Sequence, residues 1–294
     1  MLDAIEWAGA DVSVSEVEEK LARLRTDTEE GSAQRTSVMT HIAWVPEHWL
    51  SAALDVLRGL AERHPSRTIV LVPEPDAGEA AIDAELELSM FPLGDDGRSI
   101  CTETVLLRLR GARAHAPASI VTPLLVSDLP VFCRWRGEPP FGLAEFEQLL
   151  DVVDRLVVDS EEWEDLPYAY AKLARELDRT AISDIAWQRL MPWRSALAHR
   201  WPEIAGVSVV RVAGPHADAL LLAAWLRTRL GRDDILLEHD EAPSVEEVLV
   251  DREPVVPLET DPVTPADLLS NELDRFGRDA VYEQALRDAA PASP

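Results

Sequence analysis

The sequence predicts an α/β fold of two domains: a mixed sheet in the N-terminal domain, a tryptophan-rich helical connection, and a smaller C-terminal α/β domain. Three observations predict this fold. The 294 residues are enough for two domains of ordinary size. Hydrophobic residues make up 47% of the chain and charged residues 28%, which are the proportions of a globular protein with a sizeable core. Strand-like and helix-like patterns also alternate along the chain, as they do in α/β proteins.

Residues 1–35 are predicted to form an N-terminal helix and a link to the first domain. Apolar residues recur at helical spacing over 14–24, and charged residues stand between them. A polar stretch follows over 26–35. We therefore expect a short amphipathic helix here, with the body of the protein beginning after it.

The first α/β domain is predicted over residues 36–160, and it begins with a strand–helix–strand unit. The strand-like segments 36–45 and 67–72 flank a helical face over 50–61, which ends near His64 and Pro65. Two strands joined by one helix are usually parallel. Next, 82–90 and 104–109 are expected to pair antiparallel through the turn at 94–97. The rest of this domain is predicted as a helix over 114–126, a strand over 130–135, a helix over 143–150 and a strand over 156–158.

The second domain is predicted over residues 161–294. It starts with a helical connection over 163–201 that holds four of the nine tryptophans. The expected elements that follow are a strand over 207–212, a helix over 217–230 closed by Gly231, a strand over 235–239, a hairpin of 245–250 with 255–258, a helix from Thr264 to Phe276, and a last helix from Asp279. Thr264, Pro265 and Asp267 supply an N-cap, a proline in the first turn and a capping acid.

Charge and cysteine content exclude several classes of protein. The formal net charge is −26, which repels phosphate backbones and anionic lipid, so we expect neither nucleic acid nor a membrane as a partner. Cys101 and Cys133 lack the spacing of a metal knuckle or a redox pair, which favours a reducing, cytoplasmic location. No signal peptide or transmembrane run of 18 apolar residues is predicted.

Motifs for nucleotide and acyl-transfer chemistry are missing from the sequence. There is no G-x-G-x-x-G after a strand, no G-x-x-x-x-G-K and no G-x-S-x-G. The seven histidines show neither H-x-H nor H-E-x-x-H spacing. We therefore expect no cofactor, no metal and no catalytic residues.

Two segments nevertheless carry residues suited to binding a phosphate or to catalysis. His64, Ser66 and Arg67 could together hold a phosphate through charge-assisted hydrogen bonds. They could equally end one helix and start the next strand, and they precede their strand, whereas ligands of α/β sheets sit where strands end. Asp159 and Glu162 follow a strand and could be catalytic carboxylates, although a capping role for these acids is simpler.

Tryptophan and arginine residues mark two candidate surfaces for a protein partner, because these residue types are enriched in binding hot spots. One surface is Arg134 with Trp135 at the end of a strand. The other lies in the helical connection and comprises Trp187, Arg189, Trp193 and Arg194. The alternative interpretation is that these side chains pack inside the protein, with Trp187 and Trp193 joining the two domains.

Several segments, taken in order, resemble the family of glucose-6-phosphate dehydrogenase assembly proteins called OpcA. They are HPSR at 64–67, SIVTPLLVSDLPVFCRW at 119–135, DIAWQRLMPWRSALA at 184–198, AWLRTRLG at 224–231 and RFGRDAVYEQAL at 275–286. The resemblance implies a non-catalytic cytoplasmic protein of two α/β domains that binds glucose-6-phosphate dehydrogenase. It also implies that the protein promotes the active oligomer of that enzyme and raises its activity at the entry to the oxidative pentose phosphate pathway.

Two competing hypotheses belong to other classes. The first is an enzyme that handles a sugar phosphate with His64, Ser66 and Arg67 together with Asp159. The second is a scaffold that binds within a larger complex without changing kinetics.

Overall fold

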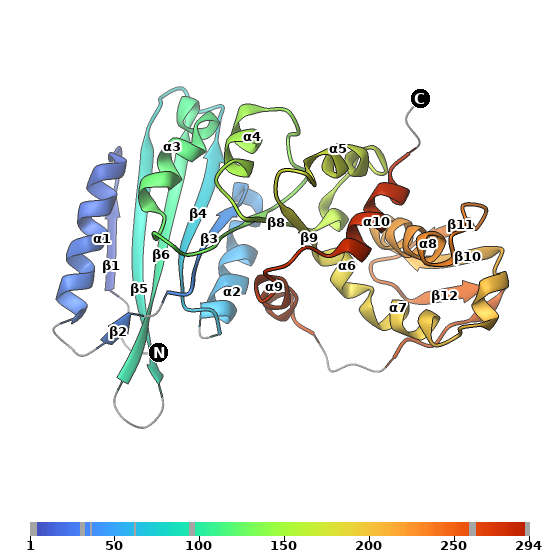
Figure 1. The fold of residues 1–294 in the computed structure, drawn as a ribbon. Helices are drawn as coiled ribbons and strands as arrows, with labels where there is room; N and C mark the ends of the chain where they lie inside the picture. Colours follow the sequence, from blue (N-terminus) through green and yellow to red (C-terminus); the bar gives the residue numbers. More distant parts are fainter. Residues whose placement is uncertain are drawn as a thin grey trace. The chain divides into compact units, whose positions relative to one another are not determined.

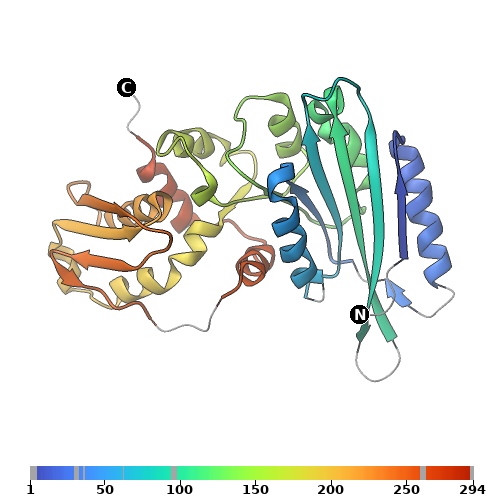
Figure 2. The ribbon, with the colours of Figure 1, turned by 180° about the vertical axis from the view of Figure 1, so that it is seen from behind.

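The computed structural model describes residues 5–29, 33–35, 37–61, 63–93, 98–258 and 263–291. The chain divides into two compact units, one ending at Leu156 and the other beginning at Val157 (Figures 1 and 2). The sequence placed this boundary after residue 160. Each unit contains helices and a β-sheet, so the predicted α/β class, with a mixed sheet in the first part and a smaller sheet in the second, is confirmed.

Unit 1 is built on a mixed sheet whose strands follow the order β1-β5-β6-β4-β3-β7-β8, with β2 also paired to β6. The strands are β1 (Ile5–Gly9), β2 (Ala33–Arg35), β3 (Met39–Trp44), β4 (Ser66–Glu74), β5 (Ile82–Leu93), β6 (Arg98–Arg110), β7 (Val131–Trp135) and β8 (Arg155–Val158), of which β8 crosses into unit 2. The helices are α1 (Val14–Glu29), α2 (Leu50–Ala61), α3 (Pro117–Val121) and α4 (Ala144–Leu150), with short 3-10 turns η1 (Glu47–Trp49), η2 (Gly111–His115) and η3 (Thr122–Leu124).

The predicted strand–helix–strand unit is confirmed. Strands β3 and β4 are parallel, with Met39 opposite Ser66 and Trp44 opposite Leu71. Helix α2 packs on one face of the sheet because its apolar residues and those of β3, β4 and β6 form one buried cluster. That cluster comprises Ala43, Val45, Leu50, Ala53, Val70, Val72 and Leu106. Figure 2 shows α2 on this face, with α3 and α4 behind the sheet.

The predicted antiparallel pair is also confirmed, since β5 and β6 pair from Ile82 opposite Leu109 to Leu93 opposite Arg98. The turn predicted at 94–97 lies outside the described residues. The segment predicted as helical over 114–126 is helical as far as Leu124, but it is not one continuous helix. The segment folds instead as η2, α3 and η3, because Pro117 and Pro123 each start a new turn and cannot continue the one before.

The first 35 residues contain more structure than the sequence indicated. Helix α1 runs to Glu29, and β2 occupies part of the segment predicted as a link. Strand β1 was not predicted, and it pairs antiparallel with β5, from Ile5 opposite Leu88 to Gly9 opposite Ala84. Because this pairing joins residues far apart in the chain, no local sequence pattern predicts it.

Unit 2 contains a separate four-stranded sheet with the order β11-β10-β12-β13. Its strands are β10 (Val209–Gly214), β11 (Leu236–Glu241), β12 (Glu247–Val250) and β13 (Glu253–Pro254), and β9 (Ala181–Asp184) follows β8 in the larger sheet. The helices are α5 (Tyr168–Glu176), α6 (Ile185–Arg189), α7 (Met191–Ala198), α8 (His216–Leu230), α9 (Pro265–Leu273) and α10 (Ala280–Ala289), with 3-10 turns η4 (Ser160–Glu162) and η5 (Glu203–Gly206).

Helix α8 is the centre of unit 2. It connects β10 to the parallel strand β11, and α10 packs beside it (Figure 1). Its residues from Ala217 to Leu226 are almost all buried, as expected of a helix that is apolar on every side. It ends as predicted at Gly231, which adopts the left-handed conformation with φ 63°.

Some of the remaining predictions for unit 2 are confirmed, and others differ from the structure. A hairpin forms around Asp251 and Arg252, both at positive φ, but its second strand is β13 at Glu253–Pro254 and not the predicted segment 255–258. The caps at Thr264 and Asp279 are confirmed, although the first of these helices ends at Leu273. Strand β9 was missed, because its four residues lie inside the segment predicted as helical. No helix in the described residues is long and apolar enough to cross a membrane.

Candidate functional site

Most residues predicted to bind a partner lie inside their own units. Arg134 and Trp135 are buried in unit 1, and Trp187, Trp193 and Arg194 are buried in unit 2. Arg189 is the exception, because a quarter of its side chain is exposed. That these six residues contact a partner stays a prediction, whereas their packing within each unit is an observation.

Trp187 and Arg194 form a stack that joins three helices of unit 2. The Arg194 guanidinium lies 3.4 Å from the centroid of the Trp187 ring, and its Nη2 donates a hydrogen bond to the Trp187 carbonyl oxygen at 3.1 Å. The Trp187 Nε1 donates to Asp279, which caps α10, and Tyr282 packs beside the ring. Burial lowers the pKa of Arg194 to about 10. The stack therefore holds α6, α7 and α10 together.

Trp135 belongs to an aromatic cluster at the carboxyl ends of β3 and β7. It stacks on Trp44 with ring centroids 4.6 Å apart, and the edge of Phe146 meets it at 5.1 Å. Arg134 donates to the Trp135 carbonyl oxygen. These contacts make the pair part of the core of unit 1 rather than an open surface.

The predicted phosphate ligands are brought together at the start of β4, but a carboxylate already occupies their strongest donor. His64, Ser66 and Arg67 are all buried. Arg67 donates from Nε to Glu103 at 2.7 Å and from Nη1 to the Leu124 carbonyl oxygen at 2.5 Å. The hypothetical fourth member of that enzyme site, Asp159, belongs to unit 2.

Glu103 is held between two arginines. Arg25 of α1 donates to it from Nε at 2.6 Å and from Nη2 at 2.9 Å, in addition to Arg67. Burial alone would raise the pKa of Glu103, but the hydrogen bond from Arg25 and the two positive charges lower it below its usual value. On the opposite face of the sheet, burial lowers the pKa of His41 to about 4, and the charges of Arg134 and His64 act in the same direction.

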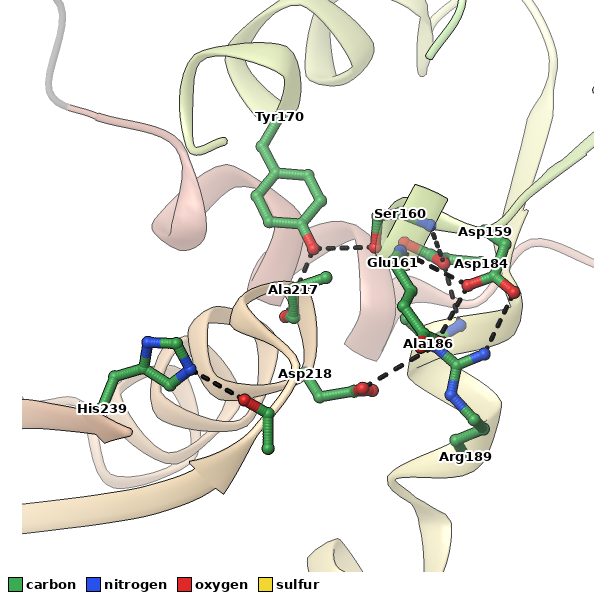
Figure 3. A network of polar contacts seen from close by, with 11 residues as sticks. Asp159, Ser160, Glu161, Tyr170, Asp184, Ala186, Arg189, Ala217, Asp218 and His239 are labelled. Atoms are coloured by element: carbon green, nitrogen blue, oxygen red, sulfur yellow. Dashed lines mark hydrogen bonds and ion pairs between the residues drawn. The ribbon is translucent and has the colours of Figure 1, made fainter. Parts of the chain in front are cut away.

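A polar network of unit 2 lies where strands end (Figure 3). Asp159 follows β8 and caps η4, and Asp184 is the last residue of β9 and caps α6. Asp218 lies in the first turn of α8, just after β10. Asp159 and Asp184 stand there for a local reason, because they accept the free backbone N–H groups of Glu161 and Ala186 at helix starts, whereas Asp218 makes no such cap. The fold then places all three near one another.

Arg189 is the cation of this network. Its Nη1 and Nη2 donate to the two carboxylate oxygens of Asp159 at 3.0 and 3.1 Å. Nη2 also lies 2.6 Å from Glu161 and 3.7 Å from Asp218. Arg189 is thus engaged on several sides, which leaves its guanidinium poorly placed to bind an anionic ligand.

Hydroxyl groups tie the network to neighbouring helices. The backbone N–H of Ser160 donates to Asp184 at 3.1 Å, and the Ser160 hydroxyl lies 2.8 Å from that of Tyr170. Tyr170 in turn donates to the Ala217 carbonyl oxygen at 3.3 Å. The site is therefore rigidly connected to α5 and α8.

The carboxylates of the network raise one another's pKa values. Burial raises the pKa of Asp184 to about 7, and the charge of Asp159 adds to the effect. Burial also raises the pKa of Asp218 to about 7, although Arg189 opposes it. The pKa of Glu161 is raised by burial and by neighbouring acids. Such a site favours a cation, yet no group of His, Cys, Asp and Glu side chains in the described ranges is arranged to hold a metal ion.

Sequence reasoning found some members of this network and missed others. Asp159 and Arg189 were singled out separately, and the structure joins them. Asp184 was recognisable as a cap before α6, but Tyr170 and Asp218 carried no signal. They were missed because their partners are distant in the chain.

Two family models match the chain in succession. The N-terminal domain of a glucose-6-phosphate dehydrogenase subunit matches residues 58–175, and the C-terminal domain of the same subunit matches residues 180–263. These matches cover much of both structural units.

Three curated relatives carry the name "Putative OxPP cycle protein OpcA". The proteins from Synechocystis sp., Synechococcus elongatus and Nostoc punctiforme are 28%, 27% and 26% identical to this chain over 186, 184 and 184 residues. Each match covers 58% of this chain and 38%, 41% and 39% of the respective relative. The chain thus spans well under half the length of the relatives it matches.

Proposed function

The chain belongs to the OpcA family of glucose-6-phosphate dehydrogenase assembly proteins, and on that premise we propose that it is a non-catalytic partner and activator of this enzyme. It binds glucose-6-phosphate dehydrogenase, promotes the active oligomer and so raises flux into the oxidative pentose phosphate pathway. The observation that carries the proposal is the pair of consecutive family matches, one for each part of the same subunit.

The two polar clusters of the structure support a binding role over catalysis. In unit 1 the Arg67 guanidinium is engaged by Glu103, and in unit 2 Arg189 is engaged by Asp159, Glu161 and Asp218. Groups that hold one another in this way stabilise a fold. They are not poised to hold a phosphate or to activate a nucleophile.

Activation by a bound protein requires a difference in affinity. A partner shifts the equilibrium of an enzyme between two states only if it binds one of them more tightly. We therefore expect this protein to contact the active oligomer of the dehydrogenase better than its inactive form.

The test is the initial rate of the host's own glucose-6-phosphate dehydrogenase against substrate concentration, with and without this protein, together with the mass of the mixture by light scattering. We expect a complex and either a lower half-saturation or a higher maximal rate. A complex with unchanged kinetics would identify a scaffold.

No complex and no change in rate would overturn the proposal and favour the sugar-phosphate enzyme. The melting temperature of this protein alone, measured with glucose 6-phosphate and with 6-phosphogluconate, then tests the sugar-phosphate enzyme hypothesis. A saturating ligand that binds only the folded state must raise the melting temperature.

A further inference from the structure

Carboxylates outnumber cations at the N-terminal end of α8. We call the group formed by Asp159, Glu161, Asp218 and Glu241 the acidic mouth. Glu161 and Glu241 are its exposed members, with side chains 40% and 72% exposed, whereas Asp218 is only 1% exposed. Burial is the main cause that raises the pKa of Glu161, and the charge of Glu241 adds to the effect. Arg189 contacts Asp159, Glu161 and Asp218, and the Nε2 atom of His239 lies 3.7 Å from Glu241.

One oxygen of the acidic mouth lacks a hydrogen bond. The Oδ1 atom of Asp218 is buried and has no partner among the described residues. An acid in the first turn of a helix often accepts the N–H of the N-cap residue, but the N-cap of α8 is Pro215, which has no N–H. The other oxygen, Oδ2, lies 3.7 Å from Arg189, which is too far for a hydrogen bond. A buried carboxylate oxygen left in this state is an acceptor that needs a donor.

The acidic mouth also occupies the place where α/β proteins bind ligands. Gly214 ends β10, Glu241 ends the parallel strand β11, and α8 starts between them. Ligands of parallel sheets bind outside the carboxyl ends of such strands. A helix N-terminus there usually attracts an anion, but the surrounding carboxylates repel one. The position therefore suits a positively charged group.

Two histidines, His216 and His239, line the same edge. The rings of His216 and His239 stack at 5.1 Å, and the His239 Nε2 donates to the Gly214 carbonyl oxygen at 2.8 Å. Burial lowers the pKa of His216, with a further contribution from His239, which favours the neutral form of the His216 ring. The excess of negative charge in the mouth is thus not cancelled by His216.

We propose that the acidic mouth binds a basic side chain, arginine or lysine, presented by the bound glucose-6-phosphate dehydrogenase. The inference rests on the proposed function and adds to it the site and the chemistry of one contact. The incoming cation pairs first with the exposed carboxylates Glu161 and Glu241. It then supplies the hydrogen-bond donor that Asp218 lacks.

The test compares the affinity of the full chain and its variants for the cognate enzyme at pH 8 and low salt, by isothermal titration calorimetry. Glu161→Gln removes one charge at the rim, and Glu253→Gln removes one from an exposed acid on β13 as a matched control. We expect Glu161→Gln to weaken binding about tenfold, as at an interface hot spot, and the control to bind as the wild type does.

Asp218→Asn tests the buried end of the mouth, and we expect it to weaken binding by a similar factor. Thermal melting of each variant checks that it is folded. If Asp218→Asn does not fold, Glu241→Gln takes its place as the second variant.

Wild-type affinity in both mouth variants would overturn the inference and leave the proposed function standing. Absence of binding by the wild-type chain would overturn both. Equal weakening by Glu161→Gln and by the control would also overturn the inference, because it would indicate diffuse charge attraction and no specific site.

Discussion

The two units bury charge in opposite ways. In unit 1 a single carboxylate, Glu103, lies between the guanidinium groups of Arg25 and Arg67. In unit 2 a single guanidinium, Arg189, lies among several carboxylates, of which Asp218 is the most buried. A buried group surrounded by opposite charge stays ionised, whereas a buried group surrounded by like charge tends to neutralise. The charge of the buried carboxylate of unit 1 is therefore neutralised by its own neighbours. The cluster of unit 2 keeps an excess of negative charge.

The pKa shifts give the two units opposite responses to pH. The lowered pKa of Glu103 and the lowered pKa of His41, about 4, mean that folded unit 1 binds fewer protons than its unfolded chain, so its stability is lost as pH falls. The raised pKa values of Asp184 and Asp218, about 7, mean that folded unit 2 binds more protons than its unfolded chain. Its stability is therefore greatest in mild acid and is lost as pH rises toward 7.

The largest effect is expected from Glu103→Gln in unit 1. The substitution keeps the size of the side chain but leaves Arg67 and Arg25 without their carboxylate, and removing one partner of a buried ion pair costs about 3–5 kcal/mol. Hydrogen exchange resolved by peptide measures the opening of β4 and β6 separately from unit 2. Glu85→Gln on the exposed side of β5 is the control. A loss below about 1 kcal/mol would show that the triad contributes little.

The pH dependence of the wild-type chain is the next largest effect. Between pH 7 and pH 5 we expect unit 1 to lose about 2 kcal/mol, because unfolded His41 takes up a proton that the folded protein excludes. Over the same interval unit 2 gains about 4 kcal/mol, roughly 2 from each of Asp184 and Asp218. Peptides from β3 and from α8 report the two changes, after correction for intrinsic exchange rates. Changes of the same sign in both units would refute the comparison.

The sequence predicted the local structural elements of both units but not the long-range pairing that brings them together. The caps at Thr264 and Asp279, the stop at Gly231 and the parallel pair β3–β4 follow from patterns of a few residues, and all are confirmed. Strands β1 and β9 were missed because long-range pairing, and not a local pattern, defines them.

The candidate sites show the same limit. Tryptophan and arginine at 187 and 194 suggested a surface, yet the structure buries both side chains. An amphipathic residue type does not reveal which way its side chain points when the surrounding helices are short. The residues of the acidic mouth come from η4 and its cap, from α8 and from β11, so its excess charge exists only in the folded chain.

Asp218→Asn tests the comparison between the units directly. Like Glu103→Gln, it replaces a buried carboxylate by an amide, but it does so among other carboxylates and not between two arginines. At pH 8 we expect the variant to raise the free energy of unfolding of unit 2 by about 1–2 kcal/mol, since it removes a carboxylate whose ionisation burial opposes. At pH 5 the two proteins should differ little. Exchange of the α8 peptides measures both values, and destabilisation at pH 8 would mean that the contact with Arg189 outweighs the burial of charge.

The smallest effect on stability is expected from Glu161→Gln, which changes an exposed acid of the acidic mouth and leaves the buried Asp218 in place. Glu161 loses its contact with Arg189, 2.6 Å away, but it also ceases to repel Asp159 and Glu241. At a partly exposed site these terms are each small, so we expect a change within about 0.5 kcal/mol at pH 8. Exchange of the α6 and α8 peptides measures it. A loss of about 2 kcal/mol would place Glu161 among the residues that hold unit 2 together. A negligible loss combined with weaker binding of the dehydrogenase would show that this charge serves the partner and not the fold.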